Sequence, residues 1–120
     1  MSRSARSVLI FGWYLVALGC ALLTIPNVML GIFGLPTTSD VWIRVVGVLV
    51  LCLAVYYIQA ARHGLTPMLR WSVYVRSTVI VFFAAFVLLG LASAPLVLFG
   101  AVDLAGALWT YWALRAEGAA

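Results

Sequence analysis

The chain carries very little charge. Only 8% of its 120 residues are charged; the seven basic residues are all arginine, and three residues are acidic. A soluble domain carries about 25% charged residues and about 45–50% apolar ones, whereas this chain is 67% hydrophobic. The composition therefore excludes a soluble globular fold and indicates an integral membrane protein, which at this length forms one compact unit.

Residues that hold metals or perform catalysis are also scarce. Cys20 and Cys52 lie inside apolar runs without a CxxC spacing, and His63 is the one histidine. A metal or redox motif needs several such residues at short spacing, so we expect no cofactor. The sequence shows no Ser/His/Asp grouping, no paired carboxylates on one helix and no glycine loop that could cradle a phosphate. We therefore expect that the protein is not an enzyme.

Long apolar segments are abundant. Each is long enough to cross about 30 Å of hydrocarbon at about 1.5 Å per helical residue. A basic cytoplasmic head is predicted at 1–7 and a disordered tail at 116–120. The predicted spans are residues 8–30, 41–62, 70–92 and 95–115. Because the turns between them are short, the predicted fold class is an all-α membrane protein with four transmembrane helices in an up-down-up-down antiparallel bundle.

The arginines predict the orientation of this bundle. They lie at the N-terminus (Arg3, Arg6), around the second turn (Arg62, Arg70) and at the C-terminus (Arg115), while the first and third turns have none outside the spans. Such an excess marks cytoplasmic segments. We expect a bacterial inner (cytoplasmic) membrane protein with both termini in the cytoplasm. The same arginines are interpreted as contacts to anionic lipid headgroups, not to nucleic acid.

One carboxylate lies inside the last span. Asp103 follows eight uncharged residues that begin at Pro95, and a charge at such a depth costs roughly 2.5–3.5 kcal/mol unless it is paired or neutral. Counting about 1.5 Å per residue places Asp103 about 12 Å below one surface, between Arg44 and Arg76. Asn27 lies in the same half of the bilayer. The predicted polar core is therefore Asn27, Arg44, Arg76 and Asp103.

Three interpretations of this polar core stay open. It could be a buried ion pair that only sets helix packing and register, a pocket for a ligand, or a proton-coupling site at Asp103. The leading functional hypothesis is a binding or accessory protein whose partners are membrane lipids, a hydrophobic small molecule or a larger membrane complex. The alternative is a proton-coupled small-molecule exporter that uses Asp103. This alternative requires a homodimer, because one four-helix unit is too narrow to seal a transport path.

Several short motifs occur along most of the chain. They are a PN-x(3)-GIFGLP turn beginning at Pro26, an R-x(2)-G pattern formed by Arg44 and Gly47, the end of that span in YY and AAR, and an arginine that enters the third span. In this pattern the chain resembles the DoxX-like group of small bacterial four-helix membrane proteins, which includes domains of unknown function. Named members look like accessory subunits of quinone-linked or thiol-linked membrane redox systems. The resemblance implies a four-helix fold and an accessory role.

Overall fold

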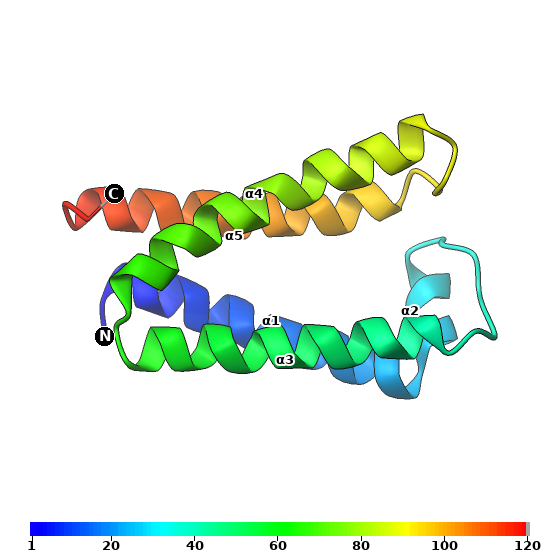
Figure 1. Cartoon of the computed structure of the whole chain (residues 1–120), viewed down its shortest axis with the longest axis horizontal. Helices are drawn as coiled ribbons and strands as arrows, with labels where there is room; N and C mark the ends of the chain where they lie inside the picture. The colour runs from blue at the N-terminus through cyan, green and yellow to red at the C-terminus, as the bar shows by residue number, and fades with distance from the viewer. Residues whose placement is uncertain (120) are drawn as a thin grey trace.

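The computed structural model describes residues 1–119, which contain helices and turns but no strand. Its helices are α1 (Arg3–Thr24), α2 (Pro26–Ile32), α3 (Trp42–Arg62), α4 (Thr66–Leu88) and α5 (Leu96–Ala116) (Figure 1). Within the described range, α1, α3, α4 and α5 are long and apolar enough to cross a membrane. The longest dimension, 45 Å, matches a bilayer with its headgroups, about 40–45 Å. The chain is a small multi-pass membrane protein.

The helices begin and end at residues that differ from the predicted spans. α1 starts at Arg3, because the side chain of Ser2 caps it by accepting a hydrogen bond from the backbone N–H of Ala5. The predicted head 1–7 is therefore mostly the first turn of this helix. The predicted first span 8–30 is interrupted before Pro26, which cannot donate a backbone hydrogen bond and starts the separate helix α2.

The long helices form two antiparallel pairs. α1 packs along α3, α4 packs along α5, and α1 also contacts α5 over a shorter length. Both termini and the α3–α4 turn lie at one end, called here the closed end, and the pairs diverge toward the end that carries α2 and the α4–α5 turn, called here the open end (Figure 1). The predicted antiparallel four-helix fold is thus confirmed. The divergence of the two pairs is a feature that the sequence did not indicate.

Close packing between α1 and α3 depends on glycine. A Cβ atom added at Gly47 would lie 2.9 Å from the carbonyl oxygen of Gly19 and 2.9 Å from the backbone nitrogen of Leu23. These are backbone atoms of the facing helix, so they cannot move aside as a side chain can. Small residues of this kind let helices approach closely in a membrane, where packing replaces the hydrophobic effect as the main attraction.

We expect Gly47→Ala to destabilise the protein by about 1–2 kcal/mol, because the added methyl group must push α1 and α3 apart. The measurement is the thermal unfolding midpoint in detergent. Gly31→Ala is the matched control, since Gly31 is helical and no atom lies within 4 Å of an added Cβ. Equal midpoints for the two variants would contradict the close contact.

At the closed end, α1 is joined to the end of α5 by apolar and polar contacts. A core cluster there includes Ala5, Val8 and Leu114. The carboxylate of Glu117 accepts hydrogen bonds from the hydroxyl of Ser4 at 2.7 Å and from its backbone N–H at 2.9 Å. The hydroxyl bond contributes most to holding the pKa of Glu117 below its usual range. In the predicted tail 116–120, Glu117 is therefore anchored to α1, and Ala120 lies outside the described residues.

Candidate functional site

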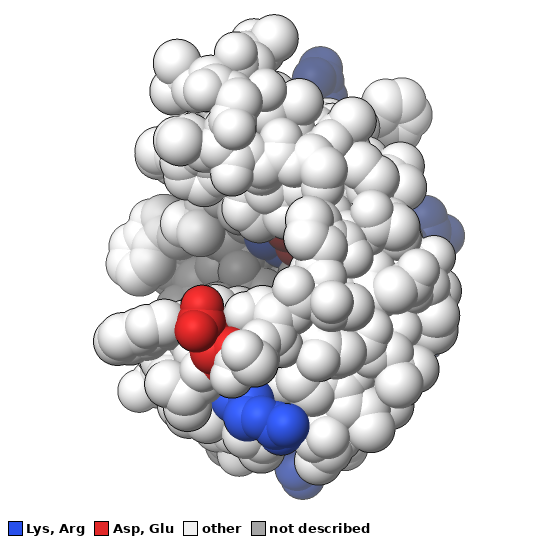
Figure 2. All heavy atoms as spheres, turned by 90° about the vertical axis from the view of Figure 1, so that its right-hand side faces the viewer, with Lys and Arg blue, Asp and Glu red and all other residues white. Residues whose placement is uncertain are grey.

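A cavity of about 310 Å³ lies between the two helix pairs. Seen from the open end, the molecule is hollowed between the pairs, and basic and acidic atoms are visible deep inside among uncharged residues (Figure 2). Its lining residues are Phe11, Tyr14, Leu15, Leu18, Leu22, Leu30, Leu35, Ile43, Val46, Val50, Leu53, Tyr57, Val75, Arg76, Val79, Phe83, Leu96, Phe99 and Asp103. The volume falls at the lower end of the range for small-molecule sites, about 300–1,000 Å³.

Helical periodicity explains how each long helix supplies one wall. The α1 wall consists of Phe11, Tyr14, Leu15, Leu18 and Leu22, and these positions recur at steps of one, three and four. Residues at such steps share one face of a helix. The α5 wall follows the same rule with Leu96, Phe99 and Asp103. The carboxylate therefore belongs to the helical face that lines the cavity.

Arg76 of α4 lines the cavity, and only 2% of its surface is exposed. Its Nε donates to the carbonyl of Ser72 at 3.2 Å, and its Nη2 donates to the hydroxyls of Ser72 at 3.1 Å and Thr110 at 2.8 Å. The guanidinium carbon lies 4.8 Å from the ring centroid of Phe11 and 5.8 Å from that of Tyr57. Cation–π contacts of this kind are strongest in dry surroundings. The cation is thus held in one orientation.

A chain of hydroxyl groups continues from Arg76 toward the closed end. The hydroxyls of Thr110 and Ser7 are 2.7 Å apart, and the hydroxyl of Ser7 donates to the carbonyl of Ser4 at 2.7 Å. Because Ser7 uses its proton there, Thr110 is the donor to Ser7 and the acceptor from Arg76. The chain joins Arg76 of α4 to Thr110 of α5 and Ser7 of α1, and all three residues are buried. It holds the two helix pairs together opposite the open end.

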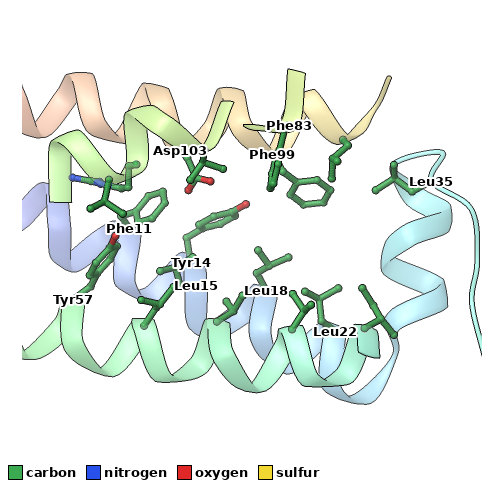
Figure 3. A pocket seen from close by; sticks show the side chains of 18 of the residues that line it. Phe11, Tyr14, Leu15, Leu18, Leu22, Leu35, Tyr57, Phe83, Phe99 and Asp103 are labelled. Atoms are coloured by element: carbon green, nitrogen blue, oxygen red, sulfur yellow. The ribbon is translucent and has the colours of Figure 1, made fainter. Parts of the chain in front are cut away.

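Asp103 is half-buried and faces the cavity from α5. Its side chain and that of Tyr14, which comes from α1, both point into the space between the helix pairs (Figure 3). Arg76 lines the same cavity, but its Nε and Nη2 bond elsewhere and its Nη1 has no partner among the described residues. Arg76 therefore makes no hydrogen bond to Asp103. The carboxylate stays available to accept hydrogen bonds from a molecule in the cavity.

The structure brings together only half of the predicted polar core. Arg76 and Asp103 line the cavity, whereas Arg44 and Asn27 do not. Arg44 is exposed and donates to the carbonyl of Leu23, and the side-chain oxygen of Asn27 accepts from the backbone N–H of Thr38 at 2.9 Å. Depth along a helix does not determine which way a residue faces, and the break before Pro26 moves Asn27 onto α2. These two residues stabilise the open end instead.

Sequence reasoning missed the hydroxyl groups that hold Arg76. Ser72 precedes Arg76 by four positions and Thr110 follows Asp103 by seven, so both spacings place the pairs on shared helical faces. Ser4 and Ser7 are likewise three positions apart, but they lay in the stretch predicted to be a basic head. A buried arginine requires hydrogen-bond acceptors. That requirement could have pointed to the hydroxyl groups on the neighbouring helical faces. Tyr14, which faces Asp103, carried no comparable signal.

Chemically, this site offers one available carboxylate beside an immobilised cation. In residues 1–119 no three metal-ligating side chains gather in one place. The predicted resemblance to the DoxX-like group stays a prediction. We found no family model, no curated protein and no solved structure that matches the chain significantly.

Proposed function

We propose that this chain is a bacterial inner-membrane protein that binds a lipid-like or otherwise hydrophobic molecule in the cavity between its helix pairs. The observation that carries the proposal is the apolar wall of this cavity with the available carboxylate of Asp103 at its side. Burial of apolar surface supplies affinity, about 25 cal/mol per Å², and a small number of polar groups orient the ligand. Arg76 lines the same cavity, and its positive charge favours a ligand whose polar end lies near Asp103.

The position of the cavity and of the arginines indicates from which side of the membrane the ligand would enter. The cavity reaches Leu30, Leu35 and Leu96 at the open end, and the arginines at the chain ends and around the second turn lie at the closed end. With the closed end in the cytoplasm, entry is from the outer half of the membrane. The side chains in the lining that could act as nucleophiles are Tyr14, Tyr57 and Asp103, and the lining contains no histidine or lysine beside them to act as a general base. A binding or accessory role fits this site better than catalysis.

We expect Val79→Trp to reduce the amount of copurifying ligand at least tenfold, because Val79 lines the cavity and the larger side chain fills it. A tenfold loss corresponds to about 1.4 kcal/mol. The measurement is native mass spectrometry of protein purified in mild detergent, which retains bound lipids and other hydrophobic molecules. Val81→Trp is the matched control, since Val81 lies on the same helix and is 65% exposed. Equal retention by both variants would contradict the proposal.

A second candidate is a proton-coupled exporter that works as a homodimer. The observation in its favour is that Asp103 faces the cavity without a hydrogen bond from Arg76, so a proton could bind and leave. Crosslinking in native membranes distinguishes the candidates at the level of assembly. Recovery of monomer alone would count against the exporter, which needs a second copy to enclose its path.

A further inference from the structure

A second hollow lies at the closed end, on the outer surface between α1 and α5. It has a volume of about 370 Å³ and is lined by Arg3, Arg6, Trp109, Trp112, Ala113 and Ala116. None of these residues lines the cavity described above. Two arginines from the first turn of α1 therefore face two tryptophans from the last turns of α5, across a floor of alanine.

The two arginines offer unused hydrogen-bond donors. Within residues 1–119, the arginine side chains that donate hydrogen bonds are those at positions 44, 70, 76 and 115. Arg3 and Arg6 are exposed, and three positions apart they share one helical face. Glu117 lies near Arg3 as a negative charge, and its oxygen atoms accept hydrogen bonds from Ser4. Two arginines against this one carboxylate leave the hollow with net positive charge.

The surface next to this hollow becomes apolar toward the membrane interior. On α1 the stripe of Arg3 and Arg6 continues through Ile10, Trp13 and Ala17, all of them exposed. On α5 the stripe of Ala116, Trp112 and Trp109 continues through Ala105, Val102 and Leu98, which are exposed as well. Both stripes follow steps of three and four residues, so each keeps to one face of its helix. Along both stripes, the basic or aromatic side chains lie near the closed end, and mainly aliphatic side chains follow toward the membrane interior.

We propose that this groove is a binding site for an anionic phospholipid. The phosphate would lie between Arg3 and Arg6, because guanidinium groups match phosphate oxygen atoms in pairs. The indoles of Trp109 and Trp112 suit the headgroup level of a bilayer. The acyl chains would then cover the aliphatic parts of the two stripes. A soluble anion would use only the two arginines. A lipid also matches the aromatic and aliphatic residues that follow them toward the membrane interior.

The test is native mass spectrometry of the full chain in detergent, titrated with phosphatidylglycerol or phosphatidylcholine. For the double variant Arg3→Gln with Arg6→Gln, we expect the affinity for phosphatidylglycerol to fall about thirtyfold. Each arginine near a charged lipid surface contributes about 1 kcal/mol, which is slightly more than fivefold in affinity. Arg62→Gln with Arg70→Gln is the matched control, because it removes two charges from the same end of the molecule. This control should change affinity by less than about threefold.

Three outcomes would overturn the proposal. Equal losses in the two double variants would show general attraction to the basic end instead of a site. Equal binding of phosphatidylcholine and phosphatidylglycerol by the unaltered protein would show that the charge is not recognised. Displacement of the lipid by millimolar inorganic phosphate would identify a site for the free anion. Selective loss in the Arg3 and Arg6 variant, with phosphate ineffective, would support it.

Discussion

Replacing Thr110 by valine should lower the free energy of unfolding by about 2–3 kcal/mol, although the two side chains have nearly the same shape. Thr110 has no exposed surface, accepts a hydrogen bond from Arg76 at 2.8 Å and lies 2.7 Å from the hydroxyl of Ser7. Valine removes an acceptor from a buried charged donor and the donor to Ser7. Hydrogen bonds to charged groups contribute about 1.5–3 kcal/mol, and unsatisfied buried groups add to the loss.

The measurement for Thr110→Val is reversible unfolding in detergent, followed by circular dichroism. Thr78→Val is the control, because Thr78 is exposed on α4 and its hydroxyl donates only to the carbonyl of Val75 in its own helix. This control should change stability by no more than about 0.5 kcal/mol. Similar effects of the two substitutions would mean that the hydroxyl chain at the closed end does not hold the helix pairs together.

Asp103→Asn should destabilise the protein by about 2–3 kcal/mol, because the buried cation of Arg76 then loses the acidic group that shares its cavity. Removing one member of a hydrogen-bonded buried pair costs about 3–5 kcal/mol, and the lower value follows from the lack of a hydrogen bond between these two side chains. Arg76→Met combined with Asp103→Asn should cost about 2–3 kcal/mol less than the sum of the single changes, because the loss at Asp103 arises from the cation that Arg76→Met removes. The measurement is again unfolding in detergent.

The control for charge removal alone is Asp40→Asn, since Asp40 is exposed in the turn before α3. It should leave stability within about 0.5 kcal/mol of the unaltered protein. Strictly additive losses at Asp103 and Arg76 would show that the two charges do not interact. That result, together with loss of transport in Asp103→Asn, would favour the exporter over the binding protein.

The sequence was sufficient to predict the four spans and their antiparallel order. Long apolar segments must form helices in a bilayer, because each backbone polar group needs a partner within its own segment, and short turns leave only antiparallel neighbours. The same reasoning identified Asp103 and Arg76 as the unusual groups, since charges are costly at that depth. The predicted first span 8–30 includes Pro26, whereas in the structure α1 ends at Thr24 and Pro26 starts a separate helix.

The direction in which side chains face was settled only by the tertiary structure. Counting residues along a helix gives the depth of Arg44 but not its azimuth, and the packing of α1 against α3 leaves that arginine at the surface. The hydroxyl chain needs Ser7 and Thr110, which are 103 positions apart, to meet across two helices.

The cavity likewise exists because the helix pairs touch at the closed end and diverge at the open end. Local sequence determines which residues are apolar and where helices stop. Contacts between distant segments determine which of those residues enclose a space, because packing depends on the simultaneous fit of all the helices.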